Sequence, residues 1–368
     1  MFRRAPLTLS GTGRALRFLS QNTMTPAANP ARYDSMQYRA CGTSGLKLPA
    51  LSLGLWQNFG ASRDYAGAVE ILRHAFDRGI THFDLANNYG PPPGAAEELL
   101  GRVLSRDLAP YRDELIVSTK AGYRMWPGPY GEFGSRKNLL ASLDRSLARL
   151  KLDYVDIFSS HRYDAGTPLE ETMGALAQAV RQGKALYVGI SSYPQQQTRD
   201  AHRILQAMGV PVILHQPSYS VINRWIENDH TIDACAELGI GVIAFSPLSQ
   251  GVLSGKYSSS RREGTRAENA AGPLRASHVE PRVLAGVERL TEIARARGQS
   301  LVQLALAWVL RRPEVTSALI GVRNREQLDE NLGTLANLGF SAEELAAIDE
   351  ATRDAQMNLY PTQKGWLS

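Results

Sequence analysis

The chain has 368 residues, which is enough for one large α/β domain or two smaller ones with a sizeable core. Hydrophobic residues make up 43% and charged residues 21%, as in an ordinary globular enzyme, and no apolar run reaches the length of a membrane span. The formal net charge of +5 is carried by five arginines among residues 1–32, so the rest of the chain is neutral overall and gives no sign of a nucleic-acid partner.

The N-terminal segment 1–32 is rich in Arg, Ser, Thr and Ala, as mitochondrial transit peptides are. It is equally consistent with translation from a misassigned start, because Met24 and Met36 are later candidates. We expect a disordered extension without a targeting function on a cytoplasmic protein, followed by a single domain over residues 33–368.

The two cysteines, Cys41 and Cys235, lie far apart and form no C-x-x-C pattern. This spacing argues against a disulfide scaffold or a thiolate metal site, and it fits a reducing compartment. We therefore expect no metal in the site.

Apolar runs and helical patterns alternate along the chain. A β-hairpin is expected over 38–51, around the turn GTSG at 42–45. Eight apolar runs typical of buried strands follow, at 51–56, 80–85, 114–119, 154–159, 185–190, 212–214, 241–245 and 318–322. Apolar residues at three- and four-residue spacing predict helices between them, at 65–75, 136–150, 169–180, 198–208, 233–238, 283–296 and 301–310.

Strands alternating with amphipathic helices indicate a parallel sheet covered by helices. Eight repeats favour a closed (β/α)8 TIM barrel, here with an N-terminal β-hairpin and an extra C-terminal helix. The long seventh connection, 249–282, is rich in Ser, Arg and Gly, and we expect it to be a mobile lid.

The second predicted strand ends in an unusual turn. Asp84 lies near the end of the strand, and Tyr89 follows on the stiff polar stretch NNYGPPPG at 87–94. This pair is either catalytic or a turn-capping aspartate beside a packed tyrosine, and this stretch alone leaves both open.

In a barrel, the residues after each strand converge on one face. They are Trp56 after the first strand, Asp84 and Tyr89 at the second, Lys120 after the third and His161 after the fourth. A buried lysine lowers the pKa of a neighbouring phenol, an aspartate holds that lysine, and an imidazole orients a carbonyl that takes the phenol's proton. Singly, Lys120 reads as a solvated edge charge and His161 as a core histidine; the four together favour a catalytic set.

A dinucleotide site needs separate support. No G-x-G-x-x-G follows a strand, so a Rossmann cofactor domain is not expected. The small-residue loop 245–251 offers backbone donors for a pyrophosphate, and Phe245 offers a ring to stack on a nicotinamide. Lys256, Arg266 and Arg323 are basic groups suited to an adenosine 2′-phosphate.

These residues together resemble the aldo-keto reductase superfamily from about Tyr38 to the last helix. The motifs that carry the resemblance are GITHFD at 79–84, YG at 89–90, STK at 118–120, SH at 160–161, VGIS at 188–191, and Gly321 followed by QL at 327–328 and EN at 330–331. The resemblance implies a (β/α)8 barrel that binds NADPH in extended form and transfers a hydride to an aldehyde or ketone.

The resemblance also implies roles for individual residues. Tyr89 is the general acid, and Asp84, Lys120 and His161 complete its tetrad. The implied cofactor contacts are Trp56, Asp84, Ser191, Ser192, Gln216, Phe245, Ser246, Leu248, Ser249, Gly251, Lys256, Arg266, Gly321, Arg323, Gln327 and Asn331. Phe245 stands where relatives have Trp or Tyr, so weaker stacking is expected. The implied substrate contacts are Trp56, Tyr89, Trp126, His161 and Arg162.

Within the superfamily, NNYGPPPG at 87–94, WPGPYG at 126–131 and HQPSY at 215–219 resemble the bacterial group that reduces L-glyceraldehyde 3-phosphate and dicarbonyls such as methylglyoxal. This group is close to the potassium-channel β subunits, and homo-oligomers are common in it. Arg162 is a candidate to hold the substrate phosphate, the alternative being a pair with Asp164. Two other functions are weighed: an NADPH-binding regulatory subunit, and a Schiff-base lyase built on Lys120.

Overall fold

The computed structural model describes residues 27–257, 273–275 and 278–360. It opens with an antiparallel hairpin of β1 (Tyr38–Ala40) and β2 (Lys47–Pro49). A closed barrel of parallel strands follows, in the order β10-β3-β4-β5-β6-β7-β8-β9. Its strands are β3 (Leu51–Gly54), β4 (His82–Asp84), β5 (Ile116–Ala121), β6 (Val155–Ser160), β7 (Ala185–Ser191), β8 (Val212–Gln216), β9 (Gly241–Ala244) and β10 (Val315–Ile320). The predicted hairpin and (β/α)8 barrel are confirmed.

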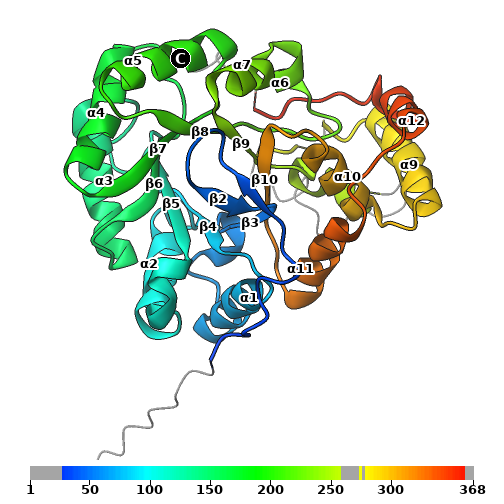
Figure 1. The fold of residues 1–368 in the computed structure, drawn as a ribbon, viewed down its shortest axis with the longest axis horizontal. Coiled ribbons are helices and arrows are strands. Elements are labelled where there is room, and N and C mark those ends of the chain that lie inside the picture. Colours follow the sequence, from blue (N-terminus) through cyan, green and yellow to red (C-terminus); the bar gives the residue numbers. More distant parts are fainter. Residues whose placement is uncertain (1–26, 258–272, 276–277, 361–368) are drawn as a thin grey trace, which may run out of the picture.

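Helices surround the barrel, with the strands gathered in the middle of the view (Figure 1). In the described part of the chain they are α1 (Tyr65–Asp77), α2 (Ala95–Arg106), α3 (Arg136–Leu150), α4 (Leu169–Arg181), α5 (Gln195–Ala207), α6 (Trp225–Asn228), α7 (Thr231–Leu238), α9 (Pro281–Ala296), α10 (Leu301–Leu310), α11 (Arg325–Leu332) and α12 (Ala342–Thr352). The last of these is the predicted C-terminal helix, and it packs against α9.

Local sequence explains the bounds of α3. In α3 the Ser135 side chain accepts a hydrogen bond from Asn138 N, and the chain leaves the helix at Lys151 with φ 56°. Leucines at three- and four-residue spacing along α3 are buried against the barrel. The expected and observed bounds of this helix are the same.

Helix α2 was not among the predicted helices, although Leu99, Leu100, Val103 and Leu104 repeat at helical spacing. Its first turn carries Glu97, which is fully buried. That carboxylate accepts hydrogen bonds from Thr119 Oγ1 on β5 at 2.5 Å and from Arg149 Nε on α3 at 2.8 Å. Glu97, which is ion-paired with Arg149, thus holds β5 through a hydrogen bond one residue before Lys120.

The structure describes only part of two predicted segments, the N-terminal extension and the lid. Residues 27–32, assigned to the extension, contact the barrel: Ala28 N donates to Tyr111 Oη at 2.8 Å and Asn29 N to Asp77 Oδ1 at 2.7 Å. Residues 1–26 lie outside the described residues. Residues 258–272 and 276–277 of the predicted lid also lie outside the described residues, and its described start is the 3-10 segment Ser249–Ser254.

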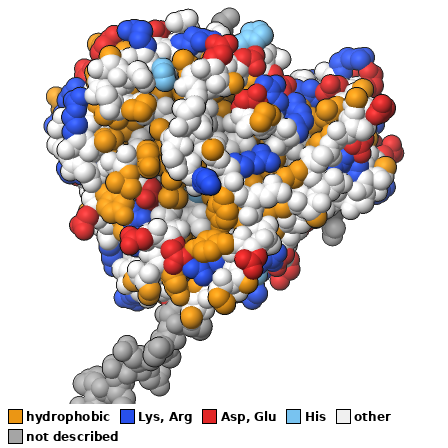
Figure 2. Space-filling view, in the orientation of Figure 1, with side chains coloured by type: hydrophobic (Ala, Val, Ile, Leu, Met, Phe, Trp, Pro, Cys, Tyr) orange, Lys and Arg blue, Asp and Glu red, His pale blue; other side chains and the backbone are white. Residues whose placement is uncertain are grey.

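Charged side chains of both signs are interspersed on the visible face (Figure 2), in keeping with the neutral balance of residues 33–368. Among the described residues, the helices are too short or too polar to cross a membrane.

Candidate active site

Asp84 and Lys120 form a buried ion pair at the ends of neighbouring strands. Asp84 is the last residue of β4, and the register of β4 against β5 sets it beside Ser118. Lys120 Nζ donates to Asp84 Oδ1 at 2.8 Å and Oδ2 at 2.7 Å, and also to the carbonyl oxygen of Leu85. Each side chain is only 2% exposed, so protein groups, and not water, solvate both charges.

Tyr89 and His161 lie next to this pair. Lys120 Nζ is 5.2 Å from the centre of the Tyr89 ring, and the rings of Tyr89 and His161 are 5.7 Å apart. The turn that carries Tyr89 is fixed by Asn87 N, which donates to Lys120 O at 2.9 Å. The structure therefore brings the four predicted residues together at the carboxyl ends of the strands.

The pKa of Tyr89 does not move in the direction expected from its lysine neighbour. Burial, together with Asp84, Tyr123 and Tyr360, raises the pKa of this phenol well above its usual 10. The physical reason is that the phenol is removed from water, and the Asp84 carboxylate offsets much of the positive charge that Lys120 would otherwise supply to it. The expectation of a lowered pKa was wrong, and Tyr89 carries its proton at neutral pH.

His161 is neutral at the same pH. Burial, and then the positive charges of Lys120 and Arg162, lower the pKa of its imidazole well below 6.5. Its Nδ1 is buried without a partner among the described residues, and its ring stands edge-on to Tyr123, with centroids 4.6 Å apart. A neutral imidazole carries one N–H, which suits it to orient a carbonyl oxygen.

Arg162, predicted to contact substrate, is buried and ion-paired. Its NH2 group donates to Glu132 Oε1 at 2.7 Å, and its guanidinium lies 4.4 Å from the ring centre of Tyr123. The partner is thus Glu132 and not Asp164, whose side chain accepts hydrogen bonds from Gly134 N, Gly166 N and Thr167 Oγ1. Trp126 is another predicted substrate residue. The centre of its ring lies 4.2 Å from the guanidinium carbon of Arg145 on α3.

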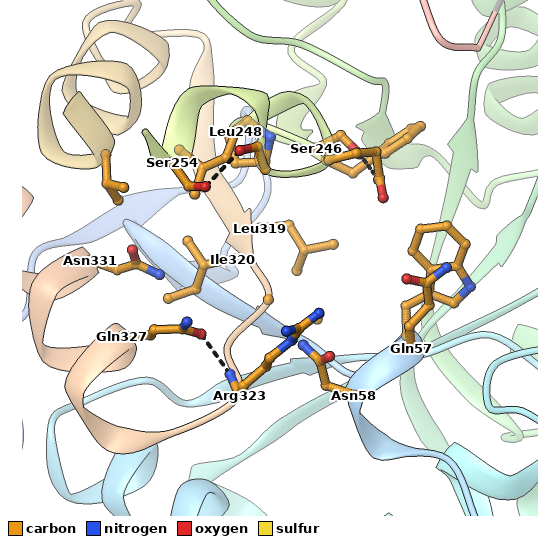
Figure 3. Close-up of a pocket in the computed structure, with 18 of the residues that line it drawn as sticks. Gln57, Asn58, Ser246, Leu248, Ser254, Leu319, Ile320, Arg323, Gln327 and Asn331 are labelled. Atoms are coloured by element: carbon orange, nitrogen blue, oxygen red, sulfur yellow. Dashed lines mark hydrogen bonds between the residues drawn. The ribbon is translucent and has the colours of Figure 1, made fainter. Parts of the chain in front are cut away.

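A cavity of about 730 Å³ opens beside the tetrad, with Trp56 and Tyr89 at one end and Arg323 and Asn331 among the residues that line it. Figure 3 shows side chains from the loop after β9, from β10 and from α11 surrounding it. The predicted cofactor residues that line it are Trp56, Phe245, Ser246, Leu248, Gly251, Lys256, Gly321, Arg323, Gln327 and Asn331.

The other predicted cofactor residues in the described part of the chain are not among those that line this cavity; Asp84 is one of them, in its pair with Lys120. Ser191 and Gln216 pair at the ends of β7 and β8, where Ser191 Oγ donates to Gln216 O at 2.8 Å and Ser192 follows at once. The Ser249 side chain is turned to Ser220, with the two hydroxyl oxygens 2.7 Å apart. Arg266 lies outside the described residues.

The loop after β9 has an unusual backbone. Ser246, Ser249, Gln250 and Gly251 have φ values of 52°, 47°, 58° and 95°. Residues in this left-handed region, next to right-handed ones, turn successive N–H groups to one side, and such concavities bind anions. At the far end of the cavity Gln327 Oε1 accepts a hydrogen bond from Arg323 N at 2.9 Å, next to the start of α11.

Sequence reasoning missed a residue of the C-terminal segment. The ring of Tyr360 meets that of Phe245 edge to face at 5.0 Å, and its hydroxyl accepts a hydrogen bond from Gln250 Nε2 at 2.6 Å. It also lies 3.1 Å from Ser246 Oγ. Tyr360 follows the last helix in a stretch without hydrophobic periodicity, so no sequence pattern pointed to it.

Comparisons with known proteins identify the family of the chain. The model of the Aldo/keto reductase family matches residues 50–353. The chain is 55% identical to L-glyceraldehyde 3-phosphate reductase from Escherichia coli O157:H7 over 338 residues, which is 90% of this chain and 97% of the relative. It is 36% identical over 303 residues to a probable voltage-gated potassium channel subunit beta from Arabidopsis thaliana, covering 81% of this chain and 90% of that protein. The chain therefore belongs to the aldo/keto reductase family of oxidoreductases.

Proposed function

We propose that this protein is an NADPH-dependent reductase of small carbonyl compounds, with L-glyceraldehyde 3-phosphate and dicarbonyls such as methylglyoxal as substrates. The observation that carries the proposal is the buried Asp84–Lys120 pair beside Tyr89 and His161, at the end of a long cavity. The identity of 55% to an L-glyceraldehyde 3-phosphate reductase over nearly its whole length supports the substrate class.

The residues that line the cavity fit an extended dinucleotide phosphate. Lys256 and Arg323 supply positive charge, Gln327 and Asn331 supply amides, and the loop after β9 supplies backbone N–H groups. Phe245 and Trp56 are the aromatic groups at the tetrad end. When bound there, NADPH would supply the hydride that adds to the carbonyl carbon.

The protein's own side chains then handle the carbonyl oxygen. Tyr89, a neutral phenol at neutral pH, gives its proton to this oxygen as negative charge develops on it, so that an alcohol forms. Lys120 stabilises the phenolate left on Tyr89, and Asp84 holds Lys120 in place. The N–H of neutral His161 orients the oxygen before transfer.

Arg162 is the proposed phosphate contact. It follows His161 directly, and Glu132 together with the rings of Tyr123 and Phe133 fixes its guanidinium. A pre-oriented guanidinium matches the geometry of a phosphate group, at the cost of sharing its charge with Glu132.

The test is NADPH oxidation followed by absorbance with paired substrates. We expect a higher kcat/KM for L-glyceraldehyde 3-phosphate than for unphosphorylated L-glyceraldehyde, turnover of methylglyoxal, and a strong preference for NADPH over NADH. Absence of turnover with the whole set, while NADPH still binds, would instead favour a regulatory subunit like the potassium channel β subunits that the chain also resembles. The predicted homo-oligomer and cytoplasmic location remain predictions, to be checked by light scattering and cell fractionation.

A further inference from the structure

A line of polar side chains runs through the barrel interior below the tetrad. Ser317 on β10, Ser52 on β3, His82 on β4 and Ser118 on β5 come from four adjacent strands. None of these side chains is more than 2% exposed. A separate apolar cluster is formed by Ile157, Ile213 and Ile243 with Cys41 and Leu48 from the hairpin end. The polar line itself comes from four neighbouring strands of the barrel.

Each neighbouring pair in this line is at hydrogen-bond distance. Ser317 Oγ lies 2.7 Å from Ser52 Oγ, and Ser52 Oγ lies 2.9 Å from His82 Nδ1. His82 Nε2 lies 2.9 Å from Ser118 Oγ. Ser118 Oγ donates to Asp84 Oδ1 at 2.6 Å, so the line ends on the carboxylate that holds Lys120.

The donor and acceptor of every hydrogen bond in this line follow from the last member of the line, Asp84. The Asp84 carboxylate only accepts, so the Ser118 hydroxyl gives it its single proton and must accept from His82 Nε2–H. Burial lowers the pKa of His82 to about 4, with Asp84 and Lys120 as the charged groups that act on it in opposite directions. A neutral His82 with its proton on Nε2 has a free lone pair on Nδ1, which accepts from Ser52, and Ser52 in turn accepts from Ser317.

We propose that His82 and Ser118 are positioning residues for the reaction: with Ser52 and Ser317 they form a one-directional chain of hydrogen bonds that fixes Asp84 and stabilises its negative charge for Lys120. All donors in the chain point toward the carboxylate, so each bond polarises the next. The proposal rests on the tetrad function described above and adds the side chains that hold its aspartate.

The first test compares single hydroxyl deletions. Ser118→Ala removes the bond to Asp84 and should lower kcat about tenfold, as expected for loss of a hydrogen bond to a charged group, while the dissociation constant for NADPH stays within about twofold. Ser317→Ala removes the most distant link and should lower kcat much less. Ser142→Ala is the matched control, because Ser142 is a buried serine that donates to Asn138 Oδ1 on α3, away from the chain. Equal losses of kcat in the Ser118 and Ser317 variants would overturn the proposal.

The second test separates the hydrogen bond from packing at His82. The amide of Gln in His82→Gln can keep a donor near the Nε2 position, whereas Met in His82→Met has a similar length and no donor. We expect the Gln variant to stay within about threefold of the parent kcat and the Met variant to fall about tenfold. Similar rates for the two variants would mean that His82 only fills space.

The third measurement does not depend on activity. Nitrogen-15 NMR of labelled protein should show, among the histidine signals, one that the His82→Gln variant lacks, and this signal should be that of a neutral ring protonated on Nε2 across the pH range of activity. A His82 protonated on Nδ1 would reverse the chain and refute the proposal. If the proposed role of the tetrad were wrong, the result would be different: the Tyr89→Phe variant would keep full activity.

Discussion

Lys120 Nζ lies 2.8 and 2.7 Å from the two carboxylate oxygens of Asp84, and neither side chain is more than 2% exposed. Two opposite charges removed from water in this way depend on each other for solvation. Burial of the phenol and the nearby Asp84 carboxylate, which offsets much of the positive charge of Lys120, explain why Tyr89 keeps its proton. The strand ends thus place a protonated phenol beside a fixed cation.

Breaking this pair should destabilise the protein. Asp84→Asn leaves the Lys120 ammonium buried without its counter-charge, which costs about 3–5 kcal/mol of unfolding free energy in comparable buried pairs. Urea unfolding of the parent and the variant measures the loss. The control is Asp144→Asn, which breaks the exposed pair of Asp144 with Lys184, at 56% and 34% exposure, and should cost less than about 1 kcal/mol. Comparable losses in the two variants would contradict the buried-pair account.

Arg162 should raise kcat/KM for phosphorylated substrates only. Arg162→Ala should lower kcat/KM for L-glyceraldehyde 3-phosphate by at least about tenfold and change that for unphosphorylated glyceraldehyde by less than about threefold. Arg124 is the matched control, since it is also paired to Glu132 but is 73% exposed, so Arg124→Ala should affect both substrates little. If the Arg162 variant slows both substrates equally, this guanidinium does not bind the phosphate.

Arg323 should set the preference for NADPH over NADH. Removing its charge with Arg323→Ala should weaken NADPH binding by about tenfold or more and leave NADH binding nearly unchanged, because only NADPH carries a 2′-phosphate. Fluorescence titration of both dinucleotides measures this. The control variant is Arg325→Ala, two residues further on in α11, which is half exposed and lies 3.8 Å from Glu70. Equal weakening of both dinucleotides would place Arg323 elsewhere in the site.

Much of the fold and of the tetrad could be predicted from the sequence, because strands that follow one another along the chain lie side by side in a (β/α)8 barrel. Asp84 ends β4, Lys120 is the last residue but one of β5 and His161 follows β6, and the closed sheet brings them to one rim. Helix α3 was predicted with its observed bounds because Ser135 and the buried leucines mark both its start and its face.

The remaining features depend on three-dimensional contacts that the pattern does not encode. The pKa of Tyr89 was assigned the wrong direction: the pairing of Asp84 with Lys120 was expected, but the burial of the phenol, which is the largest cause of the raised pKa, depends on the packed structure. The chain through His82 joins residues 30, 36 and 265 positions apart in the sequence, so no local motif reveals it. Tyr360 reaches Phe245 only through the path of the C-terminal segment.

Three buried histidines should make the protein sensitive to mild acid. Burial lowers the pKa of His82 to about 4, that of His215 to about 3 and that of His161 well below 6.5, whereas all three groups titrate near 6.5 in the unfolded chain. Below pH 6.5 the unfolded state therefore binds protons that the folded state does not, and stability falls as the pH falls toward the folded values. Between about pH 6.5 and pH 5 each histidine should cost about 2 kcal/mol of unfolding free energy.

The measurement is urea unfolding at several pH values for the parent and His215→Gln. The glutamine can still accept the hydrogen bond that Tyr193 N donates to His215 Nε2 at 3.2 Å, and it does not titrate. Between about pH 6.5 and pH 5 the stability of the variant should fall less steeply than that of the parent. The two slopes should differ by about 1.4 kcal/mol per pH unit. Parallel pH profiles for parent and variant would show that His215 is protonated in the folded state.

The most direct test of the central claim is single-turnover oxidation of NADPH by the parent and by Tyr89→Phe, with L-glyceraldehyde 3-phosphate as substrate. Removing one hydroxyl group takes away the proposed proton donor and leaves the cavity and the Asp84–Lys120 pair in place. We expect a rate at least about a hundredfold lower in the variant, with NADPH binding unchanged, because general acid catalysis commonly contributes about a hundredfold to ten-thousandfold. A variant that turns over as fast as the parent would show that the proton comes from another group.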